Sequence, residues 1–185
     1  MSIALADAIL YAAEQANVAL DPRKIEVSTD PLYSGLWVEN TRVILEENRV
    51  ATVQSQSRPL SEAAGHAVAE VVHWRLNKHF GKLRSEKARL RKMGWYGNHD
   101  AVMWEARRAA KAAGMRGLVT TSDQETGIHI EAATMEYLPS EDRPANPGRW
   151  RVTSPLGAEY SDYLDHALLD ALWAAIWMRT MREYM

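Results

Sequence analysis

Three side chains with metal-ligating chemistry share one face of a predicted helix. His66, Glu70 and His73 are spaced i, i+4 and i+7, which brings two imidazoles and a carboxylate to the same side of a helix. His166 and Asp170 repeat the first pair one hundred residues later. The alternative is a solvated polar face with weak i,i+4 pairing. We favour it, because no further ligand set is visible in the sequence.

Motifs for enzymatic chemistry are missing from the sequence. It contains no P-loop, no GxGxxG, no GxSxG and no HExxH motif. It also has no cysteine, which excludes disulfides and thiolate chemistry. We therefore expect a non-catalytic binding protein with no catalytic residues, no metal and no other cofactor.

A strongly basic segment lies in the middle of the chain. Between Arg75 and Arg116 there are 12 Lys or Arg residues against 3 Asp or Glu, a local charge of +9, although the net charge of the whole chain is -2. Aromatic residues, among them Trp74 and Trp104, are interleaved with these cations. Cations beside aromatic rings are typical of proteins that bind nucleic acids, where they contact phosphates and stack on bases.

We expect this segment to engage a nucleic acid or another polyanionic partner. The predicted binding residues are Arg75, Lys78, Lys82, Arg84, Lys87, Arg89, Arg91, Lys92, Trp95, Tyr96, Arg107, Arg108 and Lys111. Two alternatives remain open. The basic segment could dock on the acidic remainder of the same chain, or its partner could be an acidic protein surface.

The sequence contains an internal repeat. The matching pairs, in order along the chain, are DAILYAAEQA (7–16) with DAVMWEARRA (100–109), GLWVE (35–39) with GIHIE (127–131), Pro59-Leu60 with Pro155-Leu156, and His66-Ala67 with His166-Ala167. Because four blocks keep their order, the sequence indicates a tandem duplication.

Each copy has the same predicted elements. The elements of the first copy are a helix over 3–18, a strand over 24–29, two β-rich runs around Glu47-Asn48 and a helix over 60–80; those of the second are a helix over 100–113, strands over 117–121, 127–138 and 149–153, and a helix over 160–182. The predicted fold class is α+β, a tandem duplication of an α-β-β-β-α unit packed as one pseudo-twofold body. The expected domains are a first repeat (1–80), a basic connector (81–99) and a second repeat (100–185).

This order of elements resembles the double-stranded-RNA-binding domain and the first part of type III secretion chaperones. In the RNA-binding family a lysine cluster opens the last helix and grips phosphates. Here the corresponding stretches, SEAAGHAVAE and PLGAEYSDYL, are acidic. The resemblance therefore concerns element order, and no residue of either family is carried over to this chain.

The last predicted helix is apolar on two sides. Leu168, Leu172 and Ile176 form one side, while Trp173 and Trp177 lie on the other. A helix that is apolar on both sides must bury both, so either the first copy or a partner covers the two indoles. The sequence favours slightly a homodimer with these tryptophans at the interface. This suggests an alternative function as an inhibitor of another protein, a chaperone-like adaptor or an assembly component.

The remaining composition is that of an ordinary soluble protein. The stretch MSIALADAILYAAEQ lacks a basic region and carries Asp7 and Glu14, so it does not have the pattern of a signal peptide. No uncharged apolar run approaches the roughly 18 residues that a membrane span needs. We expect no membrane partner and a cytoplasmic location, which suits the lack of cysteine.

Overall fold

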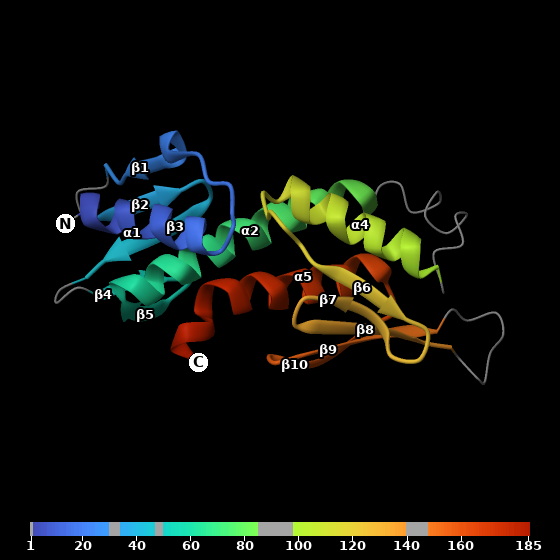
Figure 1. Ribbon diagram of the computed structural model, residues 1–185. Coiled ribbons are helices and arrows are strands. Elements are labelled where there is room, and N and C mark those ends of the chain that lie inside the picture. The colour runs from blue at the N-terminus through green and yellow to red at the C-terminus, as the bar shows by residue number, and fades with distance from the viewer. Residues whose placement is uncertain (1, 30–33, 47–49, 85–97, 140–147) are drawn as a thin grey trace. The chain divides into compact units, whose positions relative to one another are not determined.

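The computed structural model describes residues 2–29, 34–46, 50–84, 98–139 and 148–185. The fold is α+β, as predicted. Over these residues it has two five-stranded antiparallel sheets and four α-helices (Figure 1). Across the described ranges, none of the helices has both the length and the apolarity that crossing a bilayer requires.

The first sheet is an antiparallel meander between two helices. Its elements are α1 (Ser2–Gln15), a short 3-10 helix (Pro22–Lys24), β1 (Ile25–Val27), β2 (Gly35–Val38), β3 (Thr41–Leu45), β4 (Val50–Val53), β5 (Gln56–Pro59) and α2 (Leu60–Arg84). The strands pair in sequence order. Leu36, Val43 and Val53 form one cross-strand row and are buried. α1 contacts β2 and buries Leu5 and Ile9, so the 3.6-residue spacing of its apolar side chains creates the face that covers the sheet.

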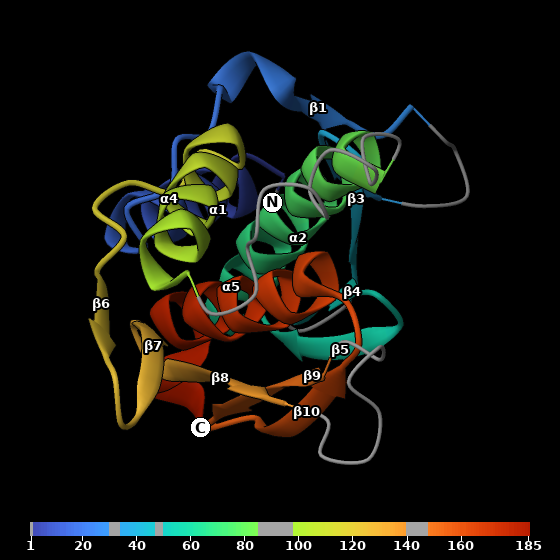
Figure 2. The same cartoon turned by 90° about the vertical axis from the view of Figure 1, so that its right-hand side faces the viewer.

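The second sheet repeats this order. Its elements are α4 (His99–Ala112), β6 (Thr120–Asp123), β7 (Gly127–Ile130), β8 (Ala133–Leu138), β9 (Arg149–Ser154), β10 (Gly157–Ser161) and α5 (Leu164–Met181), followed by a 3-10 helix (Arg182–Tyr184). Ile128, Met135 and Val152 form the buried cross-strand row. Figure 2 shows the first part of α5 above β8 and β9. Leu168 and Leu172 of this helix are buried.

Each sheet has five strands, whereas the sequence predicted three for each half. The difference in the first half comes from two turns without a glycine or proline. The backbone at Glu39 (φ 54°) turns the chain between β2 and β3, and Gln54 (φ 49°) and Ser55 (φ 62°) do so between β4 and β5. Two consecutive residues with positive φ form the type I′ geometry of a tight hairpin. This conformation is rare without glycine, so the sequence did not indicate it.

The second half shows the same two errors. Glu131 (φ 52°) separates β7 from β8, although 127–138 was predicted to be one strand. The segment from 160 onward was predicted to be helical, but Gly157–Ser161 forms β10, paired with β9. Ser161 Oγ then accepts a hydrogen bond from Tyr163 N (3.1 Å), a local turn that delays the start of the helix to Leu164.

The chain forms two compact units that interleave along the sequence. Unit 1 contains 1–74, 114–116 and 176–185, and unit 2 contains 75–113 and 117–175. Within unit 1, Val18 and Met115 form an antiparallel β-bridge. Ala19 N donates to Gly114 O and Arg116 N donates to Asn17 O, both at 2.8 Å. Unit 1 is therefore assembled from three separate stretches of chain.

Candidate polyanion-binding face on helix α4

Helix α4 brings together the described part of the predicted binding segment. Asn98 caps its first turn by accepting a hydrogen bond from Ala101 N (3.1 Å), and Lys111 lies in its last turn, where the helix dipole favours a cation. Val102 and Ala106 are buried on the side that contacts β6 and β7. This packing fixes which side chains of α4 face the solvent.

The exposed side of α4 begins with Asp100 and then carries one aromatic ring and three cations. We call it the α4 basic face; its members are Trp104, Arg107, Arg108 and Lys111. They are spaced i, i+3, i+4 and i+7, so they lie along one stripe. Trp104 is 56% exposed despite being an indole, and the guanidinium carbon of Arg108 lies 5.1 Å from the centre of its ring, a cation–π contact.

A buried carboxylate holds Arg108 in this position. Glu105 is 1% exposed, and it accepts hydrogen bonds from Arg108 Nε (2.8 Å) and Nη2 (3.1 Å). His79 Nε2, from the end of α2, lies 2.8 Å from the Glu105 carboxylate. Burying a carboxylate is costly unless it is paired, and here it has two partners. Arg108 is thus neutralised on one edge and oriented over Trp104.

The other two cations of the face differ in how they are held. Arg107 Nη2 donates to Thr120 O (3.4 Å), a long hydrogen bond to the backbone of β6. Lys111 is exposed and makes no ion pair within the part of the chain that the structure describes. The positive charge offered to a ligand therefore comes mainly from Arg107 and Lys111.

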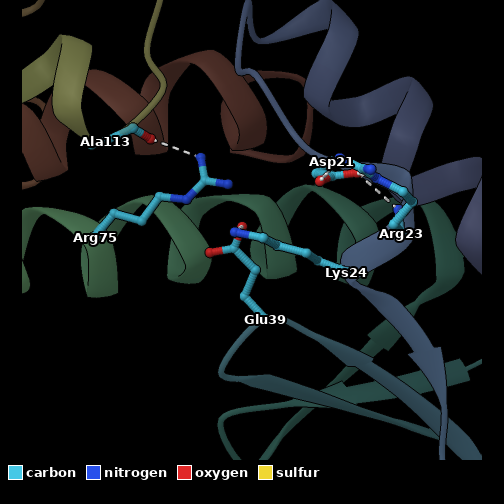
Figure 3. A network of polar contacts seen from close by, with 6 residues as sticks. All are labelled: Asp21, Arg23, Lys24, Glu39, Arg75 and Ala113. Atoms are coloured by element: carbon cyan, nitrogen blue, oxygen red, sulfur yellow. Dashed lines mark hydrogen bonds and ion pairs between the residues drawn. The ribbon is translucent and has the colours of Figure 1, made fainter.

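The remaining predicted binding residues fall into two groups. Arg75 is half-buried and donates from Nη1 to Ala113 O (2.9 Å), as Figure 3 shows, so it serves partly to hold the end of α4. Lys78 is exposed. The other members lie outside the residues whose side chains the structure describes: Lys82, Arg84, Lys87, Arg89, Arg91, Lys92, Trp95 and Tyr96.

Figure 3 also shows two ion pairs of unit 1 that lie near the start of its sheet. Asp21 accepts from Arg23, and these hydrogen bonds lower the pKa of the Asp21 carboxyl below its usual value. Lys24 Nζ lies 3.6 Å from Glu39 Oε1, beside the positive-φ turn between β2 and β3. This pair provides a contact for Glu39 at a position where no glycine relieves the backbone.

The cluster of His66, Glu70 and His73 does not form the outward polar face expected from the sequence. His66 is 2% exposed, because the ring of Trp177 packs edge-on against it with centroids 5.3 Å apart. His66 Nε2 lies 3.4 Å from one oxygen of Glu70, and His73 Nδ1 lies 4.0 Å from the other. Among the described residues, no group of three or more His, Asp or Glu is arranged to hold a metal ion.

Asp170 of α5, one hundred residues after Glu70, has different electrostatics. Burial raises the pKa of Asp170, and the carboxylate of Glu159 on β10 raises it further, while His166 opposes the shift. His166 itself is half-exposed and lies 4.0 Å from Asp165. This corner of unit 2 is therefore a place where two acidic groups repel each other.

The two tryptophans of α5 are half-buried. Trp177 contacts His66, and the guanidinium carbon of Arg58 lies 6.0 Å from the centre of its ring. Both contacts come from residues of the first half of the chain, which was one of the two covers expected for this side of the helix. The predicted homodimer interface at Trp173 and Trp177 stays a prediction.

Trp104, Glu105 and His79 belong to the candidate site but were not among the predicted binding residues. Trp104 was noted as a neighbour of the basic segment but not included. Glu105 and Arg108 are spaced i, i+3, a pattern that indicates a helical ion pair, so that contact was visible in the sequence. The contact of His79 was not, because it joins residues 26 positions apart through the packing of two helices.

Comparison with known proteins found no matching family model and no significantly similar curated protein or solved structure.

Proposed function

We propose that this chain is a non-catalytic binding protein that engages a nucleic acid or another polyanion through its basic central segment, residues 75–116. The observation that carries the proposal is the α4 basic face, where Arg107 and Lys111 extend into solvent beside an exposed indole. Phosphate backbones are recognised by such arrays of cations, and binding releases condensed counterions. The lack of cysteine suits a reducing compartment such as the cytoplasm.

A salt titration tests this function. Affinity for single-stranded DNA, duplex DNA, RNA and heparin is measured by fluorescence anisotropy over a range of salt concentrations. We expect the logarithm of the binding constant to fall linearly with the logarithm of salt concentration. The variant Arg107→Gln/Lys111→Gln should lower the slope by about 2, roughly one for each cation removed.

The matched control removes two exposed cations from elsewhere. Arg149→Gln/Arg182→Gln changes the net charge by the same amount but leaves α4 intact, and both residues are exposed. Its binding should stay within about twofold of wild type, since long-range charge is screened over about 10 Å. If wild type binds none of the four polyanions at low salt, the proposed function is wrong.

The alternative function uses α5 as a surface for another protein. Trp173 and Trp177 are half-exposed, but Trp177 already contacts His66 and Arg58. This weakens the case for a partner at that position, and we retain the polyanion as the favoured ligand. Light scattering on wild type and on Trp173→Glu/Trp177→Glu separates the readings: a wild-type monomer at micromolar concentration would rule out the homodimer.

We also infer that the two halves arose by duplication of one unit. Three local features support this. Gly35 and Gly127 each begin a strand, and a Cβ at either would lie 2.3 Å from a carbonyl oxygen of the next strand. Glu39 and Glu131 directly follow these two strands and have φ of 54° and 52°. The hydrogen bonds on either side of the bridge between Val18 and Met115 are reciprocal.

The reciprocal bridge suggests a small change in the alignment. Val18 and Met115 are 97 residues apart, whereas the sequence match between the first helices used a spacing of 93. A shift of four residues is about one helical turn, so the buried face is conserved under either spacing. Superposing residues 3–80 on 100–182 tests the duplication, because the paired helices and strands must then coincide.

A further inference from the structure

We propose that the α4 basic face binds single-stranded nucleic acid, with an unpaired base stacked on Trp104 and the adjoining phosphates at Arg107 and Lys111. The inference rests on the proposed function and narrows it from polyanions in general to ligands that offer an accessible base. Its starting point is an indole left 56% exposed in the middle of a basic helical stripe.

The ring of Trp104 is supported from within the fold. His79 and Arg108 both contact the buried Glu105, and Arg108 in turn lies over the indole at 5.1 Å. One edge of the guanidinium thereby binds the carboxylate of Glu105, and one of its faces packs on the ring of Trp104. A side chain held in place before binding loses less conformational entropy when a ligand arrives, so Trp104 is prepared to accept a flat partner.

The neighbouring cations match a ligand that carries charge next to its rings. Arg107 and Lys111 follow Trp104 by three and seven residues, so the face extends about 10 Å along the helix axis. A base can then stack on the indole while the connected phosphates meet the cations. A duplex offers no comparable fit, because its internal bases are already covered by their neighbours.

The first helix of the chain provides a built-in contrast. Tyr11 on α1 is also exposed, at 64%, and an aspartate precedes it by four residues, as Asp100 precedes Trp104. Glu14 follows Tyr11 where Arg107 follows Trp104. An exposed ring on a helix is thus present in both places, but the exposed charged residues that follow it are cations in α4 and a carboxylate in α1.

Anisotropy with four labelled probes tests the inference. Two are single strands of about 12 nucleotides, an oligothymidylate and an oligouridylate. The third is a perfectly paired duplex, and the fourth is heparin, which has charge but no bases. We expect Trp104→Ala to weaken binding to the single strands by about tenfold, within the 5- to 150-fold range of aromatic–base stacking. Heparin affinity should stay within about twofold, since the cations remain.

Two further variants make the result specific to the indole. Trp104→Phe keeps a ring and should recover most of the single-strand affinity, whereas Tyr11→Ala should leave it unchanged. Quenching of tryptophan fluorescence by the oligothymidylate should be clearly smaller in Trp104→Phe than in wild type, because the stacked indole is then missing. Circular dichroism confirms that each variant is folded, and quenching in the Phe variant gives an answer even if the Ala variant is not.

The outcomes separate this inference from the function on which it rests. Single-strand affinity unaffected by Trp104→Ala, quenching retained in Trp104→Phe, or duplex binding as tight as single-strand binding would each overturn base stacking at Trp104. In those cases salt-dependent binding that is weakened by Arg107→Gln/Lys111→Gln would leave the proposed function standing. A lack of binding to every probe would overturn both.

Discussion

Helices α1 and α4 place an aromatic ring in the same setting and then diverge in charge. Tyr11 and Trp104 are both exposed, and each follows an exposed aspartate by one turn. In α1 the next exposed residue with a charge is Glu14, whereas in α4 it is Arg107. Both helices cover a sheet with their buried side, yet their exposed sides carry charge of opposite sign. The buried side of a helix therefore does not determine the charge of its exposed side.

The charged residues near α2 and α5 also differ between the two halves of the chain. Arg58 on β5 contacts Glu62 and the ring of Trp177. On β10 the acidic Glu159 lies near Asp170 instead. The backbone features that build the sheets are alike in both halves, while the charges around them differ, so changes to the backbone should cost most and changes to surface charge least.

The largest effect is expected at the paired glycines. Gly127→Ala should lower the free energy of unfolding by about 3 kcal/mol or more, because it adds a clash with a carbonyl oxygen at 2.3 Å to the strain of φ +95°. Gly35→Ala meets a similar clash without positive φ, so about 2 kcal/mol is expected. Urea denaturation measures both.

Gly81→Ala is the control for these variants. A Cβ on Gly81 would meet nothing within 4 Å, and alanine in a helix should stabilise by about 0.5–1 kcal/mol. A loss below about 0.5 kcal/mol for Gly127→Ala would show that the strands of the two halves are not built alike.

The buried ion pair of α4 should give the next largest effect. Glu105→Gln should lower the free energy of unfolding by about 2 kcal/mol, since Arg108 and His79 lose their anionic partner. Glu14→Gln on α1, at an exposed position, should change it by less than about 0.5 kcal/mol. Equal effects in chemical denaturation would mean that Glu105 contributes no more than a surface carboxylate.

Exchanging the surface charges of the two helices should change ligand affinity more modestly. Arg107→Glu/Lys111→Glu gives α4 the sign of α1 and should weaken oligonucleotide binding by about tenfold or more at low salt. Glu14→Arg/Gln15→Arg gives α1 two cations near Tyr11, with an expected gain of about threefold. Fluorescence anisotropy at several salt concentrations measures the affinity of both variants. An unchanged affinity of the α4 variant would place the binding surface elsewhere.

The smallest effect concerns Asp170 and depends on pH. Burial and Glu159 raise the pKa of Asp170 above its usual value of 3.8, so the folded state holds this proton more strongly than the unfolded state. Stability contributed by protonated Asp170 is therefore lost as pH rises from 3.8 through the raised pKa. Asp170→Asn should stabilise by about 0.5 kcal/mol at pH 7, since solvent screens the half-exposed group, and by nothing at pH 3.

Glu70→Gln is the matched variant one hundred residues earlier. Glu70 lies between His66 and His73 and accepts a hydrogen bond from Gln54 (3.4 Å), so the loss of its charge should destabilise the protein. The melting temperature at pH 7 should therefore rise for Asp170→Asn and fall for Glu70→Gln. A fall in melting temperature for Asp170→Asn would contradict the repulsion between Asp170 and Glu159.

The helices were predictable from the sequence because apolar residues recur with helical spacing. Leu168 and Leu172 were predicted to lie on one apolar side of the last helix, and both are buried in α5. Strand number was not predictable, because the turns at Glu39 and Glu131 use positive φ without glycine. Their stability comes from the pairing of the flanking strands, which a local pattern of residues does not reveal.

For the candidate site, the basic residues of α4 were predictable and their arrangement was not. The sequence identified Arg107, Arg108 and Lys111 as cations of a binding segment. It did not distinguish Arg108, whose charge is compensated by Glu105, from Lys111. His66 was misplaced on an outward face for a related reason, since the ring that covers it belongs to Trp177, more than a hundred residues away.

The interleaving of unit 1 also constrains how the chain acquires its structure during translation. Arg179 Nη1 donates to Ala16 O (3.1 Å) and to Arg116 O (2.9 Å), so contacts that complete the unit join residues 163 positions apart. The ribosome makes the sheet of unit 1 first and delivers residues 176–185 only after all strands of unit 2. The core of unit 1 therefore stays incomplete until the last residues are synthesised. A product that ends before residue 176 would expose that core to proteases.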